Sequence, residues 1–162
     1  MQVSGLAVRL ALTPFGARVD RFCVRAFAHS PVVWLFTRAE GTAYNRPLLL
    51  TTTGRKTGRA RSVVLPYFEI PGGGIALVAS RGGMPRDPHW ARNLLACPDA
   101  RVNLLRRDRR VRARRAEGEE RRRLWNPIAE RAPIYIQYAE RAAPYREIPL
   151  FVLEAESGER LP

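Results

Sequence analysis

The chain has 162 residues, of which 28 are Lys or Arg and 15 are Asp or Glu, so its formal net charge is +13. This is about the length of one domain, which excludes a two-domain enzyme. Hydrophobic residues make up 46% and charged residues 27%. Such a composition is typical of a folded domain and not of a disordered basic tail.

The cysteines and the start of the chain predict a cellular location. Cys23 and Cys97 lie far apart, with neither a metal-ligand spacing nor the framework of a disulfide-stapled domain, so we expect a reducing compartment. Residues 1–11 lack a cationic region before their apolar stretch, which also contains Arg9, and they lack a convincing cleavage site. We expect a cytoplasmic protein, with peripheral binding to the inner face of the cell membrane left open.

The first predicted element is an amphipathic helix from Phe15 to Phe27. Its apolar residues recur with helical spacing, whereas Arg18, Arg21 and Arg25 gather on the opposite side. In one interpretation the apolar side packs on the domain and the arginines face water. In the other, the apolar side enters an anionic lipid surface. We favour the first.

A group of strands follows. Pro47–Thr53 and Arg61–Glu69 are rich in β-branched and aliphatic residues and flank a glycine-bracketed turn, Gly54–Gly58, which predicts a hairpin. A second turn at 71–74 leads to a third strand, Ile75–Ser80. The connections are too short for crossover helices, so we expect three antiparallel neighbours in succession.

The rest of the chain mixes helices and strands. Asp87 is predicted to cap a helix that starts at Pro88 and ends at Cys97. The remaining predictions are a hairpin of Arg101–Leu105 and Arg109–Ala116, helices at Glu119–Arg131 and Pro133–Arg141, and a last strand at Pro149–Glu154. This order predicts an α+β fold, a small antiparallel barrel of about six strands that carries helices.

Several reaction classes are excluded by missing motifs. The chain has no G-x-S-x-G, H-E-x-x-H or C-x-x-C, and its only histidines, His29 and His89, have no acidic partner at a local spacing. Hydrolysis by a catalytic triad or by zinc is therefore not expected, and neither histidine is assigned to a site. The glycines at 72–74 join strand to strand, so they form a hairpin turn and not a dinucleotide loop.

The turn Gly54-Arg55-Lys56-Thr57-Gly58 has the composition of an anion-binding loop. Its glycines can adopt a left-handed backbone and expose N–H groups, Thr57 offers a hydroxyl, and neighbouring arginines can grip phosphate or carboxylate. Lys56 is the only lysine in the chain. The upstream glycine and following helix of an ATP-binding loop are missing, and a solvated hairpin tip is the alternative.

Three segments together resemble the deazaflavin (coenzyme F420)-dependent nitroreductase family. They read LLLTTTGRKTGRARSVVLPYFE, ALVASRGGMPRDPHWARNLLACPDARVNL and PIYIQYAERAAPYREIPLFVLE, and the resemblance covers residues 47–154. They contain G-R-K-[ST]-G-x-x-R, a strand ending in A-S-x-G-G, P-x-W-x-x-N-L, and a tyrosine pair before R-x-I-P. The resemblance implies a split β-barrel that binds coenzyme F420 and passes a hydride to a quinone, nitroaromatic or activated alkene.

The domain organisation follows from the elements and the resemblance together. We expect one domain over residues 1–162. An N-terminal helical segment would occupy 1–45, the split-barrel deazaflavin-binding core 46–156, and a C-terminal tail 157–162.

The resemblance also implies the site residues. The turn and the next strand would hold the phosphate and acidic tail of the cofactor, and the end of the third strand would lie beside it. The implied cofactor-binding residues are Arg55, Lys56, Thr57, Arg61, Val64, Leu65, Ser80, Arg81, Gly82, Gly83 and Asn93. Trp90, Tyr135 and Tyr138 would form the acceptor side, with Tyr135 or Ser80 as the catalytic hydrogen-bond donor and no metal.

Departures from the family pattern leave alternatives open. Val64 stands where members commonly have proline, and the proline comes at Pro66, so the strand path is expected to change there. An FMN flavoprotein on the same barrel is one alternative. Another is a non-catalytic module that grips lipid or nucleic acid with the eleven arginines between Arg101 and Arg123. These lack interleaved aromatic residues, so we favour a solvated face and no specific nucleic acid, in a monomer or homodimer.

Overall fold

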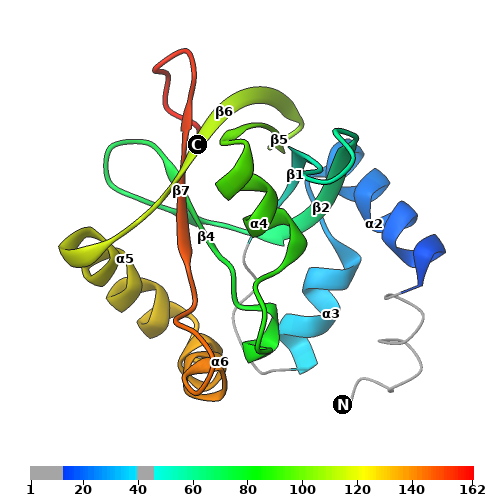
Figure 1. Ribbon diagram of the computed structural model, residues 1–162. Coiled ribbons are helices and arrows are strands. Elements are labelled where there is room, and N and C mark those ends of the chain that lie inside the picture. The colour runs from blue at the N-terminus through cyan, green and yellow to red at the C-terminus, as the bar shows by residue number, and fades with distance from the viewer. Residues whose placement is uncertain (1–12, 40–45) are drawn as a thin grey trace.

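The structure is a computed structural model that describes residues 13–39 and 46–162. Its described part is an α+β fold, in which a seven-stranded antiparallel sheet carries helices on opposite sides (Figure 1). The expected fold class is confirmed, with seven strands in place of about six. Residues 1–11, on which the expectations about a leader rest, lie outside the described residues.

The sheet has the strand order β2-β1-β5-β6-β7-β4-β3, and all its pairs are antiparallel. The strands are β1 (Pro47–Thr53), β2 (Ala60–Pro66), β3 (Phe68–Glu69), β4 (Ile75–Val78), β5 (Asp99–Leu104), β6 (Arg107–Arg115) and β7 (Leu150–Ala155). Both predicted antiparallel pairings are present, because β2 pairs with β1 and β3 pairs with β4, although the predicted middle strand is divided into β2 and β3.

The expected strand Arg61–Glu69 is divided between the two ends of the sheet. Only Tyr67 separates β2 from β3, yet these two strands are the first and the last in the strand order. The sheet must therefore curl so that its two edges approach each other, as in a split barrel. The register of β2 on β1 stays regular from Thr53 opposite Ala60 to Pro47 opposite Pro66, so the shifted proline ends the strand and does not distort it.

Two hydrophobic cores form on the two faces of the curled sheet. The first lies inside the curl and takes Trp90, Ala91 and Leu94 from α4 (His89–Ala96). The second lies between the sheet and the helices α5 (Gly118–Arg131) and α6 (Ile134–Ala142). Leu161, in the expected tail, is buried in the first core, and its N–H donates to the Gly73 carbonyl at 2.8 Å.

The amphipathic helix is present as α2 (Pro14–Phe27), followed by α3 (Pro31–Ala39), on the side of the β1–β2 hairpin (Figure 1). The helix packs on the domain against β1, β2 and β5, but the phenylalanines of its apolar side do not take part in this packing. The buried residues of α2 are Asp20 and Val24, whereas Phe15 is 75% and Phe22 65% exposed. Asp20 is held inside because its carboxylate accepts from the Ser30 hydroxyl at 2.7 Å and from the Val32 amide.

Candidate functional site

A cavity of about 810 Å³ opens between the β1–β2 hairpin and the segment that leads into α4. Cationic side chains line both of its walls, and the described lining contains no Asp or Glu. The lining residues are Thr52, Gly54, Arg55, Lys56, Thr57, Arg61, Ser62 and Val63 on the hairpin side, and Arg81, Arg86, Pro88, His89, Trp90, Arg92 and Asn93 on the other. Such a cavity suits a ligand with several negative charges.

The hairpin wall is a turn closed by its own hydrogen bonds. The amides of Gly54, Thr57 and Gly58 donate to carbonyls of the same turn at 2.7 to 3.0 Å. The expectation that the Gly54 and Gly58 N–H groups face an anion is therefore wrong, and the positive charge of this wall comes from its side chains. Gly58 has φ +65°, whereas Gly54 is needed for space, since a Cβ there would lie 3.0 Å from the Arg59 carbonyl.

Asn93 joins α4 to the hairpin wall. Its side-chain oxygen accepts from the Arg55 amide at 3.2 Å and from the Arg55 guanidinium at 3.3 Å. Its Nδ2 donates to the Thr52 hydroxyl at 3.0 Å, which in turn donates to the Arg61 carbonyl at 3.5 Å. Asn93 is buried. Its amide therefore connects α4 to both strands of the hairpin and fixes Arg55, the residue before Lys56.

The opposite wall starts with a tight 3-10 turn, η1 (Arg81–Gly83). All three residues have positive φ, and Arg81, at +47°, is the one that carries a side chain. Gly83 is required because a Cβ there would lie 2.6 Å from the Tyr138 carbonyl, so α6 could not approach. This backbone turns the chain so that Arg81 and, further on, Arg86 reach the cavity.

The start of α4 differs from the prediction. Its N-cap residue is Pro88, and no side chain caps it. Asp87 instead accepts a hydrogen bond from the Arg146 guanidinium at 2.7 Å. This bond joins two charged groups, so it is stronger than the bond that Asp87 would accept from a backbone amide as a helix cap. Trp90, two residues after Pro88, is 7% exposed and packs edge-on against Phe151 with ring centroids 5.6 Å apart. Trp90 thus gives the cavity a rigid aromatic boundary.

The structure brings about half of the expected site residues together. Those that line the cavity are Arg55, Lys56, Thr57, Arg61, Arg81, Trp90 and Asn93. Those outside its lining are Val64, Leu65, Ser80, Gly82, Gly83, Tyr135 and Tyr138. On β2 the cavity is lined by Ser62 and Val63 and not by Val64 and Leu65.

The two tyrosines belong to the second core. Tyr135 is buried and packs edge-on against Phe68, with ring centroids 5.8 Å apart, and against Tyr138 at 6.0 Å. Their helix α6 contacts η1. They therefore lie behind the wall that contains Arg81, and their roles toward an acceptor stay a prediction.

Sequence reasoning missed four residues of the second wall: Arg86, Pro88, His89 and Arg92. His89 was set aside for want of an acidic partner. It lies four residues before Asn93 on α4, a spacing that places two side chains on the same helix face and that could have identified it. Arg86 had no local signal, because its position depends on the turn at 81–83.

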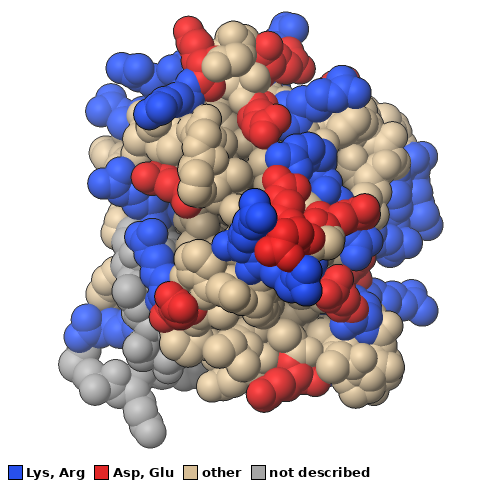
Figure 2. All heavy atoms as spheres, turned by 90° about the vertical axis from the view of Figure 1, so that its left-hand side faces the viewer, with Lys and Arg blue, Asp and Glu red and all other residues tan. Residues whose placement is uncertain are grey.

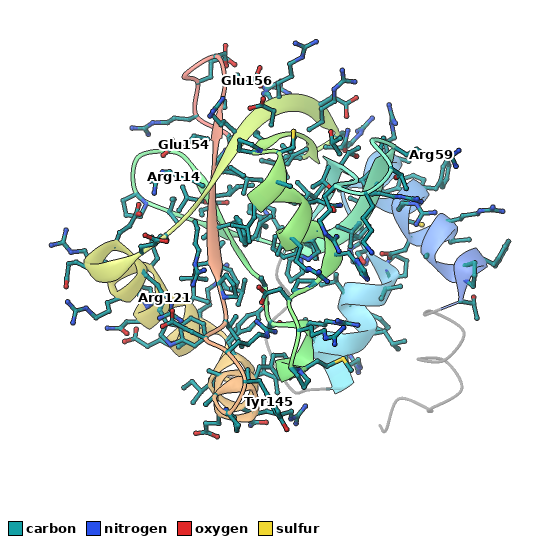
Figure 3. All side chains as sticks on the ribbon, viewed as in Figure 1. Arg59, Arg114, Arg121, Tyr145, Glu154 and Glu156 are labelled. Atoms are coloured by element: carbon teal, nitrogen blue, oxygen red, sulfur yellow. The ribbon has the colours of Figure 1, made fainter. Side chains whose placement is uncertain are left out.

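Six of the eleven arginines between 101 and 123 pair with acids, and the others lie on or beside β5 and β6. Arg114 donates to Glu120 at 2.6 and 2.7 Å and to Glu154 at 3.4 Å, and Arg112 pairs with Asp99. Figure 2 shows basic and acidic side chains intermingled on this face, and Figure 3 shows Arg114 beside Glu154. This pattern agrees with a solvated sheet face.

The chemistry of the cavity fits a deazaflavin with an acidic tail. Arginine and lysine side chains on two walls match phosphate and carboxylate groups, and Trp90 offers an aromatic surface for a ring. Among the described residues no group of His, Cys, Asp and Glu could hold a metal ion.

Comparisons with known proteins identify the family. Residues 30–155 match the family described as F420H(2)-dependent quinone reductase. The chain is 38% identical over 109 residues to an F420H(2)-dependent quinone reductase of Mycobacterium tuberculosis (strain ATCC 25618 / H37Rv), covering 65% of this chain and 71% of the relative. A putative F420H(2)-dependent quinone reductase of the same strain is 36% identical over 89 residues, covering 52% and 73%.

Solved structures give the same result. A structure of an F420-H2 dependent reductase (FDR-A) is 38% identical with a TM-score of 0.59, covering 67% of this chain and 93% of that one. A structure described as a domain-swapped dimer is 35% identical with a TM-score of 0.60, covering 77% and 100%. The resemblance inferred from the sequence is confirmed: the chain belongs to the F420H(2)-dependent quinone reductase family, and it is an oxidoreductase whose cofactor is coenzyme F420.

Proposed function

We propose that this protein reduces a quinone at the cavity between the β1–β2 hairpin and α4, and that nitroaromatics and activated alkenes serve as further acceptors. The observation that carries the proposal is the cavity itself, with cationic side chains on both walls and Trp90 on the second wall. When bound, coenzyme F420 supplies the hydride, so the protein is left to bind, orient and shield.

The hairpin wall is proposed to hold the phosphate and the acidic tail. Lys56 is an exposed point charge, and Arg55 is fixed by Asn93 in a position where its remaining N–H groups can bind oxygen atoms. Arg86 and Arg92 face the same cavity from the other side. A tail that passes between the walls meets cations on both.

The acceptor is proposed to lie near Trp90, on the side of the cavity that faces η1. A hydrogen bond from Ser80 or Tyr135 would stabilise charge that develops on the acceptor oxygen. Ser80 and Tyr135 both lie outside the cavity lining. For either of them to donate to the acceptor, the acceptor must bind beyond Arg81, toward α6, which contacts η1.

A binding comparison tests the cofactor site. Coenzyme F420, FMN and duplex DNA are titrated into the purified protein at matched ionic strength. We expect tight binding of coenzyme F420 that weakens with salt and strengthens with tail length at low salt. Tighter binding of FMN, or an affinity that does not depend on the tail, would overturn the assignment. Single-turnover oxidation of the reduced cofactor by a soluble quinone then tests the reaction.

We also propose that α2 binds an anionic membrane surface on the cytoplasmic side. Phe15, Phe22 and Phe27 are 75%, 65% and 68% exposed, and Val19 lies between them on the helix. Arg18 borders this apolar side and would contact lipid headgroups. Of the described helices, none is long and apolar enough to cross a bilayer.

Vesicle flotation tests the membrane proposal. The protein should float with vesicles that contain phosphatidylglycerol more than with phosphatidylcholine vesicles, and Phe15→Ser with Phe22→Ser should abolish flotation. Leu95→Ser is the control, because Leu95 is 55% exposed on α4, away from α2. Equal loss in the control, or flotation that survives the double change, would refute the role of α2.

A further inference from the structure

Arg146 is an arginine outside the cavity that is almost entirely buried. It follows α6 in the chain, and its side chain is 10% exposed. Its Nε donates to the Met84 carbonyl at 2.9 Å, one Nη to the Asp87 carboxylate at 2.7 Å and the Ala79 carbonyl at 3.2 Å, and the other Nη to the Ser80 carbonyl at 2.8 Å. One side chain therefore binds both ends of the segment 79–87.

That segment has a backbone that needs support. Three consecutive residues, Arg81 to Gly83, lie in the left-handed region, which costs about 1 kcal/mol or more for a non-glycine residue and persists only where neighbouring groups hold it. Arg141 adds a single bond, to the Gly82 carbonyl at 2.9 Å, from an exposed position. Arg146 is the buried group that fixes the segment.

The same segment builds the second wall of the cavity. Arg81 and Arg86 line the cavity from within it, and Pro88 and Trp90 follow directly. The position of these groups toward a ligand therefore depends on the carbonyls that Arg146 holds. A guanidinium suits this task because its donors form a planar fork, whereas a lysine ammonium is a single point charge.

We propose that Arg146 is a positioning residue for cofactor binding: it shapes the 79–87 wall without lining the cavity. The proposal rests on the proposed function, since it takes the cavity as the cofactor site. The role of Arg146 in holding the segment 79–87 does not depend on which ligand binds.

Three variants test this role. Arg146→Gln removes the charge and most of the donors, and Arg146→Lys keeps the charge but not the fork. Arg121→Gln is the matched control, because Arg121 also combines an ion pair, to Glu147 at 3.1 Å, with a carbonyl bond, to Ile148 at 3.2 Å. Arg121 lies on α5, across the molecule from the hairpin turn that carries Arg59 (Figure 3).

The first measurement is hydrogen exchange in the cofactor-free protein. Arg146→Gln should raise exchange at amides 80–87 by roughly tenfold or more while the strands stay protected, and Arg121→Gln should leave 80–87 unchanged. Uniform faster exchange, or unchanged exchange at 80–87, would overturn the proposal. If Arg146→Gln does not fold, Arg146→Lys and Asp87→Asn give the same comparison in milder form.

The second measurement is the affinity for coenzyme F420, below the melting temperature of every variant. Arg146→Gln should weaken binding by about ten- to a hundredfold, Arg146→Lys should recover part of the loss, and kcat at saturating cofactor should stay within about threefold. Equal weakening by Arg121→Gln would mean that general stability controls affinity. Failure of the wild type to bind would refute the proposed function, and the exchange result would still stand for or against Arg146.

Discussion

Replacing Asn93 with aspartate should separate the stability of the hairpin wall from its affinity for an anion. The carboxylate can keep both bonds from Arg55, whereas it cannot donate to the Thr52 hydroxyl as the Asn93 amide does. It also adds a negative charge to a cavity wall that carries none. The two effects act on different measurements.

The expected magnitudes follow from the bonds that each change removes. Asn93→Ala loses three hydrogen bonds, and at a net contribution of about 0.5–1.5 kcal/mol each the free energy of unfolding should fall by roughly 1.5–4.5 kcal/mol. Asn93→Asp loses one, so it should lose about 1 kcal/mol. The affinity for coenzyme F420 should rank the other way. Asn93→Ala should bind about three- to tenfold more weakly than the wild type, because Arg55 loses its support. Asn93→Asp should bind roughly tenfold more weakly again, because its carboxylate repels the anionic cofactor.

Urea unfolding and a fluorescence titration of the cofactor measure these two rankings on the same three proteins. The titration is repeated at high salt, where the repulsion in the Asp variant should shrink because mobile ions screen it. If both properties fall in the same order, or if Asn93→Asp binds the cofactor like the wild type, then Asn93 does not act by holding the hairpin beside an anion.

Three further sets of substitutions test the hairpin wall, the acceptor side and a surface ion pair. Lys56→Ala with Arg61→Ala should weaken cofactor binding far more than Arg107→Ala with Arg110→Ala, measured by titration, because only the first pair lines the cavity; equal losses would indicate a general charge effect. Tyr135→Phe should leave the cofactor affinity intact and slow single-turnover quinone reduction by roughly ten- to a thousandfold, and an unchanged rate would leave Tyr135 as a packing residue. The hydrogen bond from Arg114 holds the pKa of the Glu120 carboxyl below its ordinary value of 4.5, so Glu120→Gln should lower stability by less than about 1 kcal/mol at pH 7. Because a lowered pKa stabilises the fold only while the carboxyl is ionised, this difference should vanish as the pH falls below 4.5 and through the lowered pKa in urea unfolding; a difference that persists at pH 2 would contradict it.

Local patterns predicted the elements well where neighbours in sequence decide them. The β1–β2 hairpin and its cationic turn, the two helices after residue 117 and the last strand were all found from alternation, helical spacing and turn residues. The β5–β6 turn was placed only approximately. Its two residues, Leu105 and Arg106, have φ of 50° and 67°, although neither is a residue that favours such a turn.

Predictions failed where a partner distant in sequence decides the outcome. Asp87 looked like a helix cap, but Arg146, 59 residues later, binds its carboxylate. The periodicity of α2 identified the helix and missed its buried side, because Asp20 is drawn inward by hydrogen bonds from α3 and the residue before it. A pattern confined to the residues of one helix contains neither of these hydrogen-bond partners. The second cavity wall was incomplete for the same reason.

The cavity walls come from segments 52–63 and 81–93, and the clamp on the second wall comes from residue 146. These parts come together only in the folded protein, so a ligand that requires both walls and Arg146 binds the native state and not the unfolded chain. At a free concentration one hundred times its Kd, such a ligand adds about 2.7 kcal/mol to the free energy of unfolding. Changes of this size alter the amount of a protein that escapes proteolysis several-fold. A cell that runs short of coenzyme F420 should therefore contain less of this protein, even at a constant rate of synthesis.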